Sequence, residues 1–185
     1  KINECNNKQK REVRLVRNQK SVRKSMYTDH EITLEEHLSW IKRLENDDKQ
    51  IVFVVLLDDK VSGVVSINAL DKLHKKSDWA FYLDENQRGG LGAALEFALI
   101  NYAFDDLKLE KLNCEVIETN QAVVKMHKKF AFEEEGFRRS NIEKNGERIG
   151  VYFLGLTRMD WVSARDIIAS RYQSILGKLS VQIEK

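Results

Sequence analysis

A glycine-rich turn between two apolar segments most constrains how this chain can fold. The turn, residues 87–92 (QRGGLG), follows the apolar run 79–83, and apolar residues then recur at helical spacing from Leu91 to Tyr102. The turn is therefore predicted to join a strand to a helix. The first N–H groups of a helix have no partner inside it and lie at the positive end of its dipole, where anions bind. The sequence thus predicts a pyrophosphate-binding loop, with an ordinary turn as the alternative.

Short helical and strand-like segments make up the rest of the chain. Thr33 and Glu36 form a capping box ahead of helically spaced apolar residues, and the turns at 58–60 and 144–146 favour antiparallel pairing. Helices are expected at 10–18, 22–27, 33–44, 91–107, 120–130 and 163–179. Strands are expected at 51–57, 61–70, 77–83, 111–117, 132–142 and 147–159.

This order of elements predicts an α/β (α+β) fold. Its mixed, mostly antiparallel sheet would carry helices on both faces, plus a C-terminal helix. The 185 residues suggest a single domain, with a core at about 10–160 and a helical extension at about 163–179. Ligand sites in such sheets lie where neighbouring strands diverge, which favours strands 77–83 and 111–117.

Composition excludes several classes of function. The net charge of +2 gives no strong electrostatic case for nucleic acid or a membrane surface. Cys5 and Cys114 are isolated, which fits a reducing compartment and gives no zinc motif, so we expect no metal. No segment has the pattern of a membrane span or a signal peptide. A cytoplasmic location is therefore expected.

Three separated motifs resemble those of the GCN5-related N-acetyltransferases (GNAT family). The loop matches their Gln-x-x-Gly-x-Gly pyrophosphate motif, and 81–83 matches the strand whose backbone pairs with pantetheine. Residues 120–132 match their pattern of Asn, Ala, Leu-Tyr and Gly-Phe, with Val123 for the Ala and Met126-His127 for the Leu-Tyr. The resemblance covers roughly 50–160 and implies an acetyl-CoA-dependent enzyme. It implies acetyl-CoA binding by Phe81, Tyr82, Leu83, Gln87, Arg88, Gly89, Gly90, Leu91, Gly92 and Asn120.

The resemblance also implies two catalytic groups. Glu115, five residues before Asn120, is the expected general base, and an exposed strand carboxylate is the alternative. His127 stands where the family usually has a tyrosine acid. It is expected either to protonate the leaving thiolate or to position the sulfur. The alternative is a surface histidine flanking an inward stripe of Val123, Met126 and Phe130.

The N-terminal segment 17–41 resembles one subfamily, the N-acetyltransferases of pseudaminic acid biosynthesis. That resemblance implies a UDP-linked amino sugar, UDP-4-amino-4,6-dideoxy-N-acetyl-β-L-altrosamine, as the acceptor. Arg17 and Arg23 would bind the UDP phosphates by bidentate hydrogen bonds, with solvated surface arginines as the alternative. The helical stripe of His37 and Trp40 would line the sugar-nucleotide pocket or, alternatively, belong to the core. The expected substrate-binding residues are Arg17, Asn18, Arg23, His37 and Trp40.

Two other functions stay open at this point. One is a ribosomal-protein or peptide N-terminal acetyltransferase, which the family also contains. The other is a catalytically weak acyl-CoA-binding module, supported by the missing tyrosine at position 127. The acyl chain preference is open, and so are the oligomeric state and a homodimer contact through the C-terminal helix.

Overall fold

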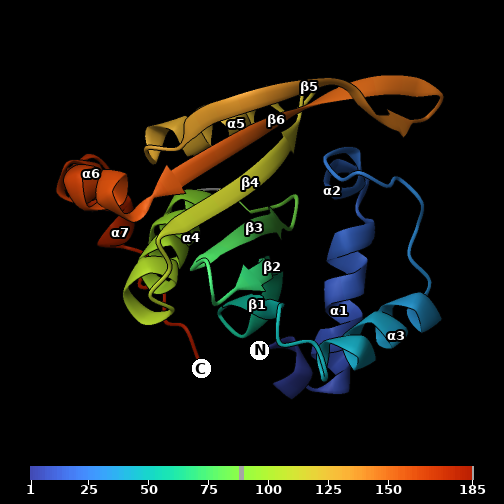
Figure 1. Cartoon of the computed structure of the whole chain (residues 1–185). Helices are drawn as coiled ribbons and strands as arrows, with labels where there is room; N and C mark the ends of the chain where they lie inside the picture. Colours follow the sequence, from blue (N-terminus) through green and yellow to red (C-terminus); the bar gives the residue numbers. More distant parts are fainter. Residues whose placement is uncertain (88–89, 185) are drawn as a thin grey trace. The chain divides into compact units, whose positions relative to one another are not determined.

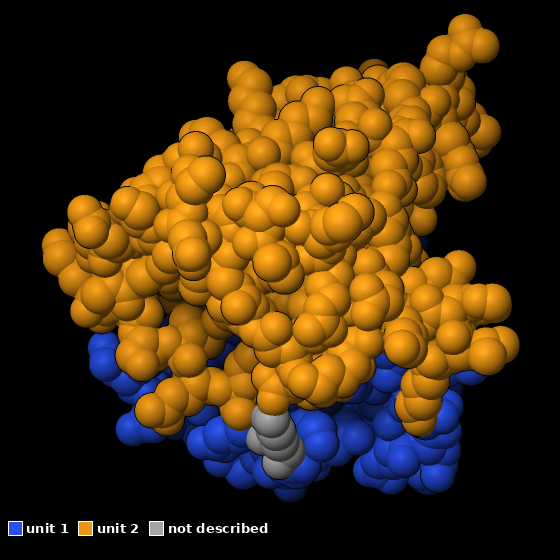
Figure 2. All heavy atoms as spheres, turned by 60° about the vertical axis from the view of Figure 1, so that its left-hand side comes forward, with its two compact units in different colours: residues 1–70, 79–87, 184–185 blue, residues 71–78, 88–183 orange. Residues whose placement is uncertain are grey.

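The structure is a computed structural model that describes residues 1–87 and 90–184. It divides into two compact units, and Figure 2 colours them separately. Unit 1 takes residues 1–70, 79–87 and 184–185, and unit 2 takes residues 71–78 and 88–183. The expectation of a single domain over 1–185 stays a prediction.

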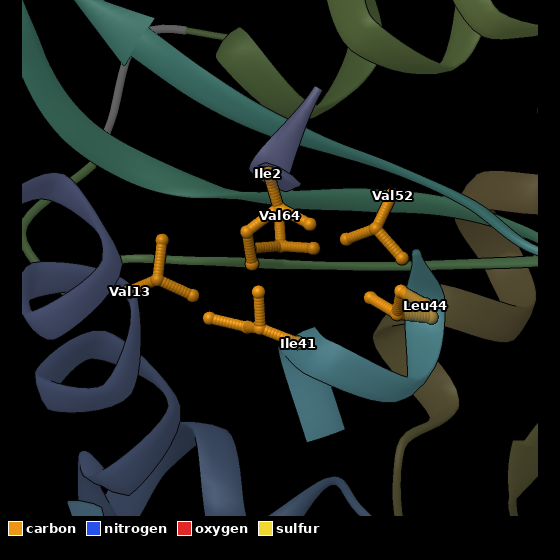
Figure 3. Close-up of a cluster of buried hydrophobic side chains, with 6 residues drawn as sticks. All are labelled: Ile2, Val13, Ile41, Leu44, Val52 and Val64. Atoms are coloured by element: carbon orange, nitrogen blue, oxygen red, sulfur yellow. The ribbon is translucent and has the colours of Figure 1, made fainter. Parts of the chain in front are cut away.

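Unit 1 packs N-terminal helices on a hairpin. Its helical elements are η1 (Ile2–Glu4), α1 (Asn7–Asn18), α2 (Lys20–Lys24) and α3 (Leu34–Leu44). Its strands are β1 (Ile51–Leu57), β2 (Lys60–Asp71) and the C-terminal part of β3 (Lys76–Leu83). One buried cluster joins η1, α1, α3, β1 and β2 (Figure 3). It consists of Ile2, Val13, Ile41, Leu44, Val52 and Val64.

Side-chain caps determine where the first helices begin. The Thr33 side chain accepts from the N–H of Glu36, which confirms the predicted capping box of α3. Helix α1 starts at Asn7, three residues earlier than the expected Lys10. The reason is a second capping box, in which Asn6 and Gln9 satisfy each other's backbone N–H. The expected helix at 22–27 is instead α2, which ends at Lys24.

Unit 2 contains the helix that follows the glycine-rich turn. Its helical elements are α4 (Leu91–Asn101), a π-helical turn (Tyr102–Asp106), α5 (Gln121–Lys129), α6 (Arg158–Arg171) and α7 (Gln173–Leu176). Its strands are β4 (Lys111–Ile117), β5 (Glu133–Lys144) and β6 (Glu147–Thr157). The expected strand to residue 159 was too long. Strand β6 ends at Thr157 because the Thr157 side chain caps α6 at the N–H of Asp160. The expected single helix at 163–179 is instead two helices, α6 and α7. Helix α6 begins earlier, at Arg158, and the helices are separated at Tyr172.

The six strands follow the order β1-β2-β3-β4-β6-β5 (Figure 1). Strands β1 and β2 pair antiparallel, as do β4 with β6 and β5 with β6. The β3–β4 pair is parallel, and its register runs only from Lys76↔Lys111 to Asp78↔Asn113. The predicted fold class, a mixed and mostly antiparallel sheet with helices and a C-terminal helix, is confirmed.

Candidate active site

The first turn of α4 has the features of an anion-binding site. Gly90 is the N-cap residue and adopts a left-handed conformation, with φ 91° and ψ 9°. Among the described residues, no side chain caps this helix, and its first turn carries no acidic residue. The leading N–H groups of α4 therefore fit an anionic group such as a pyrophosphate. Arg88 and Gly89, expected in the same loop, lie outside the described residues.

Helix α7 lies against the same glycine. A Cβ atom at Gly90 would stand 2.6 Å from Cδ1 and 2.9 Å from Cγ2 of Ile175. Real Cβ contacts are essentially never that short, so the Ile175 side chain fills the space that any other residue at position 90 would need. Glycine is required here both for its backbone conformation and for this close approach.

The expected pantetheine strand is well fixed in unit 1. Gly63 of β2 faces Tyr82 and Leu83 so closely that a Cβ there would clash with the Tyr82 carbonyl oxygen. Tyr82 also packs against the buried cluster of unit 1. Gln87 Nε2 donates to the hydroxyl of Ser62 at 3.3 Å. These contacts hold β3 and the start of the glycine-rich turn in place.

A buried acid–histidine pair joins α4 to α5. Nδ1 of His127 lies 2.7 Å from Oε1 of Glu96, and the two side chains are 4% and 0% exposed. The imidazole ring also lies 5.4 Å from the ring of Phe132, centroid to centroid. Sequence reasoning missed Glu96. Its signal was a single charge inside the otherwise apolar run of α4.

The inward face of α5 differs from the predicted stripe. The buried residues are Val124, His127 and Phe130, whereas Val123 and Met126 are only half-buried. His127 therefore belongs to the inward face, and the alternative of a surface histidine is wrong. Asn120 stands at the N-cap of α5, where its side chain makes no capping hydrogen bond.

Glu115 lies in β4 opposite Phe153 of β6. Its side chain is exposed, while the alternate residues Leu112, Cys114 and Val116 are buried. This alternation is as expected for a strand with one face on a core. A carboxylate can accept a proton either directly or through water.

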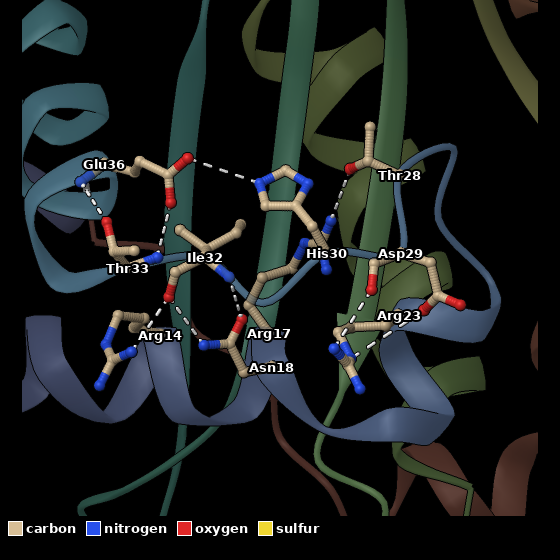
Figure 4. Close-up of polar contacts among 10 residues, drawn as sticks. All are labelled: Arg14, Arg17, Asn18, Arg23, Thr28, Asp29, His30, Ile32, Thr33 and Glu36. Carbon is tan, nitrogen blue, oxygen red and sulfur yellow. Dashed lines mark hydrogen bonds and ion pairs between the residues drawn. The ribbon is translucent and has the colours of Figure 1, made fainter. Parts of the chain in front are cut away.

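Two of the three polar residues predicted to bind substrate in 17–23 hold the segment that leads to α3 (Figure 4). The side chain of Asn18 exchanges hydrogen bonds with the backbone N–H and carbonyl oxygen of Ile32, both at 2.9 Å. Arg23 donates to the carbonyl oxygen of Asp29 and forms an ion pair with Glu31 at 3.5 Å. Asn18 and Arg23 thus have structural partners within unit 1.

Arg17 differs from these neighbours. Its Nη2 makes a long hydrogen bond of 3.5 Å to Thr28, and its Nη1 is buried with no partner among the described residues. Burial lowers the pKa of the Arg17 guanidinium, and the nearby Tyr82 phenol opposes that shift. Burial also raises the pKa of Tyr82, which Arg17 opposes. A half-buried cation with an unmet donor therefore lies near β3.

The remaining predicted substrate residues are in the core of unit 1. His37 is buried and donates from Nε2 to the carbonyl oxygen of Lys10 at 2.8 Å. Burial lowers the pKa of His37, which fits a neutral donor. Its ring lies 5.5 Å from the ring of Trp40, centroid to centroid and tilted by 41°, and Trp40 packs against the buried cluster. This environment matches the core alternative for the 37–40 stripe.

Over 1–87 and 90–184, no three or more His, Cys, Asp or Glu side chains gather in a way that could hold a metal ion. Among the helices formed by those residues, none has the length and apolarity needed to cross a membrane.

Comparison with known proteins gives the family. Residues 2–151 match the acetyltransferase (GNAT) domain model. The chain is 29% identical to acetyltransferase PseH of Campylobacter jejuni over 116 residues, which cover 63% of this chain and 71% of PseH. It is 25% identical to the putative ribosomal N-acetyltransferase YdaF of Bacillus subtilis over 58% of this chain and 59% of YdaF.

Solved structures share the fold. Spermidine N-acetyltransferase from Vibrio cholerae, in complex with CoA and spermine, superposes with a TM-score of 0.78 at 17% identity, covering 85% of this chain and 95% of that one. Campylobacter jejuni PseH in complex with acetyl coenzyme A gives 0.64 at 23% identity, again over 85% and 95%. Because the family model spans most of the sequence, the chain belongs to the GNAT family of acetyl-CoA-dependent N-acetyltransferases.

Proposed function

We propose that this enzyme transfers the acetyl group of acetyl-CoA to the 4-amino group of a UDP-linked amino-dideoxy sugar. The acceptor is UDP-4-amino-4,6-dideoxy-N-acetyl-β-L-altrosamine, and the reaction would serve pseudaminic acid biosynthesis and flagellin glycosylation. The similarity to acetyltransferase PseH supports this choice. We further propose that the whole chain acts as one acyltransferase domain.

One observation carries the choice of an anionic acceptor. The buried Nη1 of Arg17 lacks a partner among the described residues, and a buried donor without an acceptor costs about 1–3 kcal/mol. A phosphate oxygen would satisfy that donor with a charge-assisted hydrogen bond. A polyamine such as spermidine would instead bring positive charge to a guanidinium. Arg17 therefore favours a nucleotide sugar over a cationic acceptor.

Acetyl transfer then needs four contributions from the protein. The first turn of α4 binds the pyrophosphate, and the N–H of Leu83 donates to the thioester carbonyl oxygen as it becomes an oxyanion. The Glu115 carboxylate, directly or through water, accepts a proton from the attacking amine. His127 donates a proton to the departing CoA thiolate.

The test is an acceptor panel for the parent protein and for Arg17→Met. Acetyl-CoA is incubated with the UDP-amino sugar, spermidine and a peptide with a free N-terminus, and free thiol and product mass are measured. We expect acetylation of the UDP-amino sugar. We also expect a KM for that sugar at least about 10-fold higher in Arg17→Met, given the strength of a charge-assisted bond.

The matched control is Arg11→Met, since Arg11 is an exposed arginine on the same helix α1. It should leave that KM unchanged. Acetylation of the peptide alone would favour the ribosomal or peptide reaction. Acetylation of spermidine alone would mean that Arg17 does not select the acceptor, and thiol release with none of the three would contradict the proposed substrate.

A further inference from the structure

Glu96 and His127 form a deeply buried ionisable pair in unit 2. Glu96 is 0% exposed inside an apolar helix, and its Oε2 has no hydrogen-bond partner among the described residues. A buried carboxylate with only one partner destabilises the fold relative to an apolar residue of the same volume. The packing of α4 therefore does not account for a glutamate at this position.

The chemistry of the pair follows from its charges. Burial raises the pKa of Glu96, and the hydrogen bond and charge of His127 oppose that rise. Lys128 and Lys129, next on α5, are exposed, and Lys128 forms an ion pair with Glu134 of β5. With a doubly protonated imidazole, the pair has no net charge.

The hydrogen bond also selects a ring nitrogen. A carboxylate that accepts from Nδ1–H holds the ring in one orientation and tautomer, so that any proton the ring gives up comes from Nε2. Building on the proposed function, we propose that Glu96 is a positioning residue that holds His127 through Nδ1–H and directs its Nε2 proton to the leaving thiolate of CoA.

The neutral amine forms a C–N bond to the thioester carbon, and the C–S bond breaks with its electron pair on sulfur. The Nε2 proton of the imidazolium passes to that sulfur, which gives CoA as the free thiol. The surplus proton on the new amide nitrogen goes to Glu115 or water. His127 is left neutral with Nδ1–H still bound to Glu96, and solvent returns its Nε2 proton before the next cycle.

The first test reads the pair without any acceptor. The chain has four histidines, so ¹⁵N spectra of the imidazoles can be assigned with His→Gln variants at positions 30, 37 and 74. We expect the Nδ1 of His127 to carry a proton bonded to Glu96. A ring that carries its proton on Nε2 and none on Nδ1 would mean that Glu96 donates to the ring, and would overturn the proposal.

The second test is Glu96→Gln, which keeps an amide oxygen to accept from Nδ1–H and removes the charge. We expect kcat to fall by at least about 10-fold near neutral pH, since general acids contribute on the order of 10²–10⁴. The KM for acetyl-CoA should stay within about twofold.

The control is Glu36→Gln, in the exposed pair where Glu36 Oε1 lies 3.6 Å from Nε2 of His30. Glutamine preserves the capping box at Thr33, so activity and pH profile should match the parent. If the parent acetylates its acceptor and Glu96→Gln matches it at every pH, the positioning role is refuted and the proposed function stands. If no acceptor is acetylated, the proposed function fails and the ¹⁵N spectra still show which ring nitrogen of His127 carries the proton bonded to Glu96.

Discussion

The contact between Gly90 and Ile175 allows a quantitative prediction about α7. Gly90 and Gly146 both have positive φ, 91° and 81°, but only Gly90 has close neighbours. A Cβ at Gly146 would meet nothing within 4 Å. Changing each glycine to alanine therefore applies a similar backbone strain, and only Gly90→Ala adds a collision with Ile175.

The two contributions can be estimated separately. A residue with a Cβ in the left-handed region costs about 1–2 kcal/mol, which is the full effect expected for Gly146→Ala. Three atoms of Ile175 lie within 3.0 Å of the new Cβ position, so the whole Ile175 side chain must move. Such overpacking costs a further amount of about 1–3 kcal/mol. We expect Gly90→Ala to lower the free energy of unfolding by about 2–5 kcal/mol.

Urea unfolding with linear extrapolation measures these differences. Ile175→Ala removes the colliding side chain. In combination with Gly90→Ala, the loss should therefore be about 1–3 kcal/mol smaller than the sum of the two single changes. Ile175→Ala and Gly146→Ala should add within about 0.5 kcal/mol. The contact would be refuted if Gly90→Ala and Gly146→Ala lost equal stability and each was additive with Ile175→Ala. Sequence alone would favour Gly90→Glu as a probe of acetyl-CoA binding, but that change would also disturb α7.

Three further outcomes are expected. His127→Leu should cost about 3–5 kcal/mol in unfolding at pH 7, because it leaves the Glu96 carboxylate buried and unpaired. Burial raises the Glu96 pKa, so this loss of stability should grow as the pH rises above about 4.3, the pKa of Glu in the unfolded chain, and shrink below it. Adding Glu96→Leu to the His127→Leu variant should recover most of the lost stability. Glu115→Gln should lower turnover on the order of 10²–10⁴-fold, most at low pH where the acceptor amine is protonated, and rates within twofold at every pH would reject Glu115 as the base. Asn6→Ala should cost about 1 kcal/mol by removing the cap of α1, as chemical denaturation can measure.

Local signals were enough to predict much of the fold. The limits of β1 and β4 and the capping box of α3 follow from short patterns of apolar, turn and capping residues, and the structure confirms them. The start of α1 was misjudged because its cap, Asn6 and Gln9, lies ahead of the first inward apolar residue, Val13. The signal existed, but no apolar periodicity pointed to it.

Tertiary contacts explain what the sequence could not give at the candidate site. On α5, Val123 begins an apolar stripe with Met126 and Phe130, whereas the buried face runs through Val124 and the polar His127, and only packing determines that Val124 rather than Val123 is buried. The partner of His127 is 31 residues away on another helix, and a lone glutamate in an apolar run names no partner. The unmet donor of Arg17 also depends on burial, which no local pattern reports.

Strand β3 has a consequence for how this protein is made. Its first residues, 76–78, pair with β4 in unit 2, and 79–87 belong to unit 1, so neither unit is a continuous piece of chain. A ribosome delivers 71–78 before 79–87, and Glu184, which also belongs to unit 1, follows about 100 residues later. Neither half can be obtained by cutting the chain once. During synthesis, unit 1 therefore stays incomplete after its β1–β2 hairpin has emerged, until residues 79–87 follow.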